Sequence, residues 1–120
     1  IIFLGIKITE ISKNTAVTKM KISNKIMAPN GFIHGGSITS LADTACGMGT
    51  MYHLKDGEMF ATVELKTNFI SAVETGTLVC KATLEHEGKT LHVWDAKILE
   101  EKSLKVVALF RCTQMIIRRK

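Results

Sequence analysis

Hydrophobic and polar residues alternate along most of the chain. Residues 16–23 place Ala16, Thr18, Met20 and Ile22 on one side, and mostly polar residues on the other. A period of two is typical of a β-strand, and it recurs over residues 61–69, 78–84 and 90–99. Residues 106–117 are apolar on nearly both faces, interrupted by Arg111 and Gln114. This pattern predicts a strand that is covered on both sides and central in its sheet.

One segment has a different period. Over residues 37–53, Ile38, Leu41, Ala45, Met48 and Tyr52 recur at spacings of three and four, which predicts a helix of about four turns. A stretch rich in glycine and proline precedes it, and turn dipeptides separate the strands that follow.

The elements predict one architecture. A single helix cannot cover five or six strands unless the sheet curls around it, so we expect an α+β fold in which a strongly curved antiparallel sheet wraps around one central helix. The short loops favour a meander of neighbouring strands. With 120 residues, the chain predicts a single domain over residues 1–120.

Composition excludes several classes of function. No apolar run is long enough to span a membrane, and no zinc-finger, recognition-helix or RNA-binding pattern is present, so we expect neither membrane nor nucleic-acid binding. The net charge of +5 permits small anionic partners. The odd count of three widely separated cysteines, without a signal peptide, predicts buried free thiols, a cytoplasmic location and no metal site.

Two glycines open the predicted helix. The first N–H groups of a helix lack partners within it, and Gly35 and Gly36 would let a ligand oxygen approach them closely. The helix dipole adds positive charge there, so the segment could stabilise an oxyanion. A flexible entry to the helix is the alternative.

Asp43 is unusual for a helix interior. Its neighbours three and four residues away are Thr39, Ser40 and Gly47, which form a narrow polar stripe on an apolar helix. A carboxylate there could face a cleft or form a structural salt bridge.

These residues resemble a known pattern. Gly31, His34-Gly35-Gly36 and Leu41-Ala42-Asp43 are similar to the motif of hotdog-fold acyl-CoA thioesterases of the phenylacetate-degradation (PaaI-like) type. The resemblance extends over residues 15–117 and includes residues 63–69, residues 88–91 and Arg111. It implies a hotdog fold and hydrolysis of an acyl-CoA, with coenzyme A as part of the substrate and no separate cofactor.

The resemblance also implies roles for individual residues. Asp43 would attack the thioester or activate water, and the Gly35 N–H would polarise the carbonyl. His34 would lie beside the thioester or only order its loop, and Thr62 would position the water or thioester. Substrate-binding roles fall on Asn30, Gly36, Gly88, Lys89, Thr90 and Arg111. The family usually carries Asn or Gln six residues before the motif histidine, where this chain has Ala28, and the nearby Asn30 is a possible substitute.

Helix geometry predicts self-association. Gly35 and Asp43 are eight residues apart, or about 12 Å along one helix, too far to serve one carbonyl. Two antiparallel helices across a two-fold axis would bring Asp43 of one chain near Gly35 of the other, so we expect at least a dimer. The resemblance to hotdog proteins implies a homodimer or homotetramer.

Two other functions stay open. A non-catalytic acyl-CoA binding module is consistent with Ala28. Hotdog hydratases and dehydratases resemble one another in having a histidine about five residues after the aspartate. This chain has Met48 at that position. The acyl pocket is not readable, although Met48, Met51, Tyr52 and Met59 would either line it or belong to the core.

Overall fold

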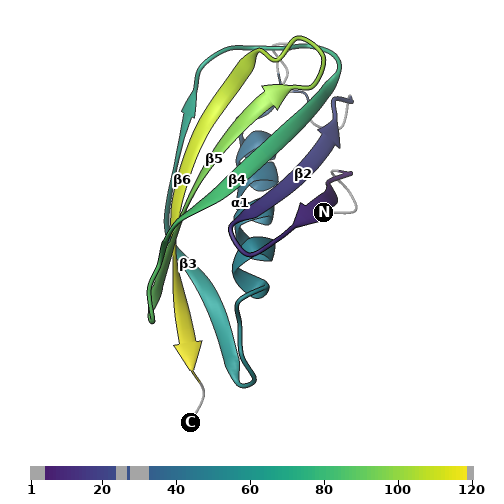
Figure 1. Cartoon of the computed structure of the whole chain (residues 1–120). Helices are drawn as coiled ribbons and strands as arrows, with labels where there is room; N and C mark the ends of the chain where they lie inside the picture. Colours follow the sequence, from purple (N-terminus) through teal and green to yellow (C-terminus); the bar gives the residue numbers. More distant parts are fainter. Residues whose placement is uncertain (1–4, 24–26, 28–32, 119–120) are drawn as a thin grey trace.

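The computed structural model describes residues 5–23, 27 and 33–118, which form one helix and six strands. In chain order these are β1 (Lys7–Ile11), β2 (Thr15–Lys21), α1 (Gly35–Met51), β3 (Glu58–Phe69), β4 (Thr77–Glu87), β5 (Leu91–Glu100) and β6 (Val106–Arg118). The strands form one curved antiparallel sheet, and α1 lies in its hollow (Figure 1). The predicted α+β hotdog architecture is confirmed.

The strand order is β1-β2-β4-β5-β6-β3. The predicted meander is correct for β4, β5 and β6 but wrong for β3, which pairs with β6 at the far edge of the sheet. The connection after β3 first stays beside β6, where the N–H groups of Ile70 and Ser71 both donate to the carbonyl of Val107. It then crosses the end of the sheet to reach β4, beside β2 (Figure 1). Strand β1 lies at the other edge, and the sequence pattern does not predict it, because its two apolar residues, Ile8 and Ile11, are three positions apart.

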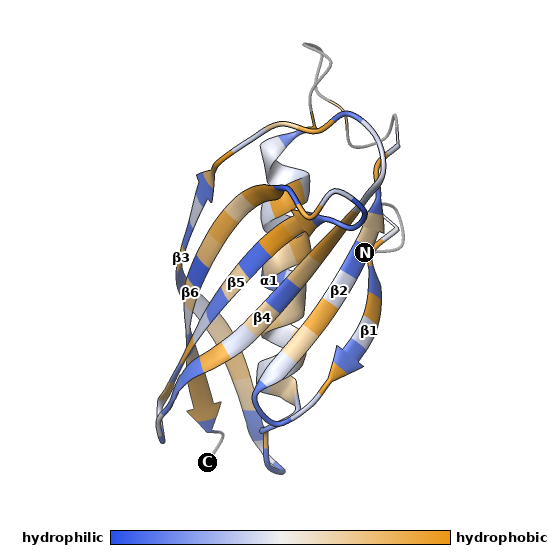
Figure 2. Ribbon diagram, turned by 45° about the horizontal axis from the view of Figure 1, so that its top comes forward, coloured by the Kyte–Doolittle hydropathy of each residue, from blue (hydrophilic) through white to orange (hydrophobic). Residues whose placement is uncertain are grey.

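The core lies between α1 and the inner face of the sheet. Figure 2 shows apolar and polar residues alternating along the strands, as expected for a sheet with one buried face. Trp94, Leu41, Met20 and Ile98 are among the largest fully buried side chains. The three cysteines, Cys46, Cys80 and Cys112, are all buried and free, as predicted.

Strand β6 is flanked by β5 and β3, so the prediction of an interior strand is confirmed. The predicted coverage of both faces of β6 is not found. Three of its apolar side chains are exposed within this chain: Leu109, Met115 and Ile117. The helix covers one face of the sheet only, because the described residues form a single helix.

Two helical glycines determine how closely α1 approaches the sheet. A Cβ at Gly49 would lie 2.4 Å from Cη2 of the fully buried Trp94. A Cβ at Gly47 would lie 3.2 Å from Cζ of the half-buried Phe60. Close contact between helix and sheet therefore requires a glycine most strongly at position 49.

We expect Gly49→Ala to destabilise the fold by about 2 kcal/mol or more, because overpacking outweighs the gain of about 1 kcal/mol that alanine usually brings to a helix. Thermal unfolding measures the effect. Gly47→Ala is the matched control and should cost less, since the Phe60 ring can shift. Equal stability of Gly49→Ala and the parent would contradict this packing.

No helix in the described part of the chain is long and apolar enough to cross a membrane.

Candidate active site

A polar face of α1 lies against β3 and β6. Thr39, Asp43 and Thr50 recur at spacings of four and seven, which puts them on one side of the helix. The hydroxyls of Thr39 and Thr67 are 2.9 Å apart, and the Thr62 hydroxyl donates to Oδ1 of Asp43 at 3.3 Å. Of the polar stripe predicted from the sequence, Thr39 and Asp43 contact the edge strand β3, whereas the Ser40 hydroxyl donates to the Gly36 carbonyl of its own helix.

Asp43 is half-buried and held by a single hydroxyl. Among the described residues, no lysine, arginine or histidine forms an ion pair with it. The salt-bridge alternative thus finds no partner within residues 33–118. A carboxylate with one oxygen bound and no neutralising cation can act as a base or nucleophile.

His34 caps the N-terminus of α1. Its Nδ1 accepts the Gly36 N–H at 3.1 Å, and its carbonyl accepts the Ser37 N–H at 2.9 Å. The helix therefore begins at Gly35, two residues earlier than predicted. The sequence did not indicate this start because histidine is not among the usual capping residues. The Gly35 N–H has no acceptor among the described residues, so it is the donor that a ligand can use. The Gly36 N–H is already bound to His34.

An apolar hollow of about 350 Å³ opens at this end of the helix. It is lined by Gly35 and by the apolar side chains of Ile33, Ile38, Phe69, Ile70, Val73 and Val107, among others. A Cβ at Gly35 would lie 2.9 Å from Cζ of Phe69, so the glycine lets that ring lie over the start of the helix.

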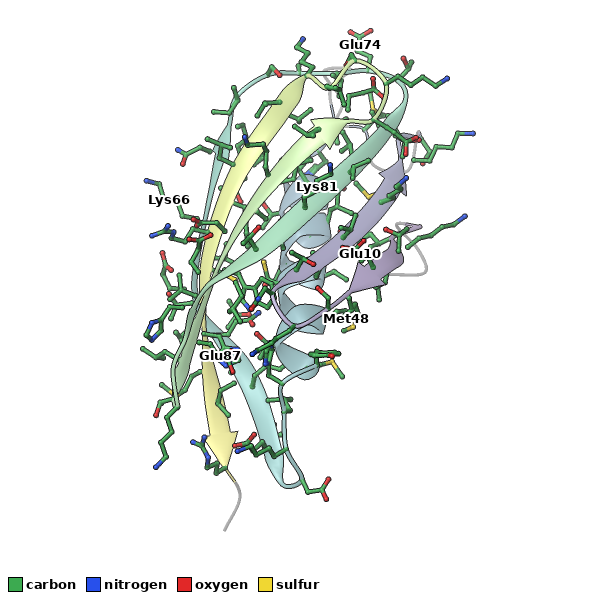
Figure 3. All side chains as sticks on the ribbon, in the orientation of Figure 1. Glu10, Met48, Lys66, Glu74, Lys81 and Glu87 are labelled. Carbon is green, nitrogen blue, oxygen red and sulfur yellow. The ribbon has the colours of Figure 1, made fainter. Side chains whose placement is uncertain are left out.

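The methionine cluster lies elsewhere. Figure 3 places Met48 beside the C-terminal half of α1, while Met51, Tyr52 and Met59 are exposed there. The interpretation of these residues as core is therefore wrong for those three. Met51 and Tyr52 lie at the C-terminal end of α1, and Met59 lies near the start of β3.

The Gly88–Thr90 turn lies at the opposite end of the molecule from Gly35. It follows Glu87, which Figure 3 labels near the end of β4. Gly88 and Lys89 line a hollow of about 260 Å³ together with Lys55, Arg118, Glu58, Glu87, His53, His92 and Ile116.

The charges around this turn are partly paired. Arg118 donates to the Lys89 carbonyl at 2.7 Å and pairs with Glu58 at 2.9 Å. Burial and the neighbouring His53 lower the pKa of His92, which keeps its imidazole neutral at pH 7. Lys55 and Lys89 form no ion pair within the part of the chain that the structure describes.

Arg111 lies on the outer face of the sheet. Its guanidinium donates to both carboxylate oxygens of Asp95, at 2.5 and 2.7 Å, and this contact lowers the pKa of Asp95. The hollow that Arg111 lines, about 410 Å³, contains neither Lys89 nor Gly35. The structure thus brings together Asp43 with Thr62 and Gly35 with His34, but separates Lys89 from Arg111. Asn30 and Ala28 lie outside the described residues.

Comparison with known proteins settles the family. The family model described as "Thioesterase superfamily" matches residues 30–107. The chain belongs to this thioesterase superfamily.

Individual relatives agree with this family assignment. It is 33% identical over 110 residues to the acyl-coenzyme A thioesterase PaaI of Escherichia coli, covering 90% of this chain and 75% of that protein. It is 30% identical to a 1,4-dihydroxy-2-naphthoyl-CoA hydrolase of Listeria monocytogenes, covering 92% and 89%. A crystal structure of a thioesterase from Haemophilus influenzae superposes with a TM-score of 0.91 at 26% identity, covering 98% and 81%.

The sequence did not predict a buried polar network on the same helix face. Trp94 Nε1 donates to the Thr50 hydroxyl at 2.8 Å, and that hydroxyl donates to Oε1 of Gln114. Gln114 is also the cross-strand partner of Thr62. The available signal was a glutamine within an otherwise apolar strand, which was noted only as an interruption.

Proposed function

We propose that this protein hydrolyses acyl-CoA thioesters to a free acid and coenzyme A. The observation that carries the proposal is the Asp43 carboxylate, placed on the polar helix face beside Thr62 and free of any ion pair among the described residues, in a chain of the thioesterase superfamily. Relatives named as acyl-CoA hydrolases and the net charge of +5 are consistent with an anionic CoA substrate.

The reaction follows from the properties of these groups. Asp43 attacks the thioester carbonyl or takes a proton from the attacking water. The Thr62 hydroxyl orients the water or the thioester. Negative charge then develops on the carbonyl oxygen, where the Gly35 N–H and the helix dipole stabilise it. Collapse of the intermediate breaks the C–S bond and expels the CoA thiolate, which takes up the proton from Asp43 when Asp43 has acted as the base. When Asp43 is the nucleophile, water hydrolyses the resulting anhydride and restores the carboxylate.

The His34 ring is suited to the same neighbourhood. Since Nδ1 accepts a hydrogen bond, the proton of the neutral ring is on Nε2, which can donate to substrate. His34 therefore caps the helix and leaves one donor beside the proposed oxyanion site.

The proposed site needs two chains. Gly35 and Asp43 are about two helical turns apart on α1. Strand β3 is an edge strand, and the exposed apolar side chains Val63, Leu65, Phe69 and Ile70 lie along it or directly after it. Such an edge favours pairing with a second copy. A two-fold axis there would place Gly35 of one chain near Asp43 of the other.

The same axis accounts for both ends of the substrate. The apolar hollow beside Gly35 suits the acyl chain. The Gly88–Thr90 turn lies at the opposite end of the molecule from Gly35 of its own chain, and a two-fold axis along β3 would bring that end toward Gly35 of the partner. Lys89, with Lys55 nearby, is therefore the cation placed best for the CoA phosphates.

We expect Lys89→Ala to raise KM for acyl-CoA about fivefold and to leave kcat nearly unchanged, because a contact to a remote phosphate is made equally in ground and transition states. The effect should shrink at high salt, since exposed charges are screened over about 10 Å. Arg111→Ala is measured beside it: a rise in KM there would mean that the nucleotide reaches the outer face of the sheet. Unchanged KM values in both variants would place the phosphates elsewhere.

The activity itself is tested with a panel of acyl-CoA substrates of different chain length and aromatic content, followed by release of free thiol. Turnover of at least one substrate is the expected result. Tight binding of acyl-CoA without any turnover would instead favour a non-catalytic binding module, the alternative that Ala28 suggests. The hydratase alternative has no support at Met48, which cannot act as an acid or base.

A further inference from the structure

Gln114 is a fully buried amide in the centre of the helix–sheet interface. Its Oε1 accepts a hydrogen bond from the Thr50 hydroxyl, and Thr50 in turn accepts one from Trp94 Nε1. All three side chains have no exposed surface. The network therefore forms without help from bulk solvent.

The direction of this network follows from Trp94. An indole N–H can only donate, so the Thr50 oxygen accepts from it and has its own proton to give. The Thr50 hydroxyl donates that proton to Oε1 of Gln114. The Nε2 group of the amide consequently points away from Thr50.

Nε2 of Gln114 has no hydrogen-bond partner among the described residues, and it is shielded from solvent. A buried donor without an acceptor is destabilising, so such groups are usually satisfied by an ordered water. The unpartnered amide therefore indicates an ordered water beside Nε2.

The surroundings of Nε2 indicate what the occupant contacts. A Cβ at Gly47 would lie 4.0 Å from Nε2, which places the amide against α1 one turn after Asp43. On the sheet side, Gln114 is directly opposite Thr62, whose hydroxyl donates to Asp43. Opposed side chains on one face have Cβ atoms about 5 Å apart. The amide of Gln114 and the carboxylate that Thr62 binds therefore border the same space between α1, β3 and β6.

We propose that Gln114 is a positioning residue that holds one buried water between its Nε2 and the Asp43 carboxylate. The water accepts from Nε2 and donates to Asp43, while Thr62 donates to the other side of the same carboxylate. Asp43 is thereby fixed from two directions, and Gln114 stays neutral and makes no covalent contact. The link to catalysis rests on the proposed function of Asp43.

The first experiment is a high-resolution crystal structure of the intact protein and of Gln114→Met, which keeps the shape of the side chain and removes the amide. We expect a water within hydrogen-bond distance of both Nε2 and Asp43 in the parent, and its loss in the variant. A parent structure without that water would overturn the proposal. This result does not depend on any enzymatic activity, so it separates the water site from the proposed function.

The second experiment is kinetic. We expect Gln114→Met to lower kcat about tenfold with KM unchanged, as for a group that acts on the reacting carboxylate through another molecule. The matched control is Thr18→Val, which removes another fully buried contact between sheet and helix, the hydrogen bond from Thr18 to the Leu41 carbonyl. Unfolding curves report the stability of both variants. If Gln114→Met loses stability like the control but keeps its kcat, Gln114 is only structural and the proposal fails.

Discussion

Asp43→Asn is expected to lower kcat for acyl-CoA hydrolysis by about 1,000-fold or more, with little change in folding. The amide keeps the size of the side chain and can still accept the Thr62 hydrogen bond, but it can neither take a proton nor attack a carbonyl. No ion pair within the described residues is lost, so the stability should survive. Single-turnover measurements and a binding assay for coenzyme A separate the chemical step from binding.

The matched control for this change is Glu64→Gln. It neutralises an exposed carboxylate on β3, the edge strand that also carries Thr62. Within the described residues, Glu64 accepts one long hydrogen bond, from Thr113 at 3.4 Å, and forms no hydrogen bond with α1. Its activity should equal that of the parent. Normal turnover by Asp43→Asn would remove Asp43 from the mechanism.

Mixing two inactive variants should restore activity if the site is shared between chains. In a heterodimer of Asp43→Asn and Gly35→Pro, one site receives both substitutions and the other receives none. We therefore expect about half of the parental activity per heterodimer, from two proteins that are each inactive alone. Co-expression with two different affinity tags provides the heterodimer for the assay.

The structure supports the choice of Gly35→Pro. Position 35 is the first helical residue, where proline is well tolerated, and His34 has the extended backbone that a following proline requires (φ −62°, ψ 126°). The substitution removes the proposed N–H donor and obliges the exposed ring of Phe69 to move. Circular dichroism checks that this variant folds. A silent mixture with folded, confirmed heterodimers would mean that Asp43 and Gly35 do not act across chains.

Much of the fold could be predicted because its signals are local. The periods of two and of about 3.6 residues located five of the six strands and the helix, and the imbalance between one helix and many strands implied a curved sheet. The position of β3 could not be predicted this way. Short loops favour neighbouring strands, but the segment after Phe69 remains bonded to Val107 of β6 and crosses to β4 only afterwards.

The candidate site shows the same division. Asp43 was identified because a carboxylate on an apolar helix conflicts with local preference, and its proximity to Thr62 is consistent with the role expected from the resemblance. The pairing of Arg111 with Asp95 depends on the register between β5 and β6, which no local pattern reveals. Gln114 was missed for the same reason: its partners Thr50 and Trp94 come from two other elements.

The order of the strands also has a consequence for synthesis. Among the described strands, β3 pairs only with β6, and β6 is the last of these six to be synthesised. Until then, the helix that carries Asp43 has emerged while the strand that carries Thr62 has no sheet to join. The nascent chain must therefore keep a long strand with several apolar side chains unpaired through the translation of β4 and β5, a stage at which exposed strand edges are prone to aggregate. Ribosome-bound chains that end before residue 106 should accordingly depend more on chaperones than the completed protein does.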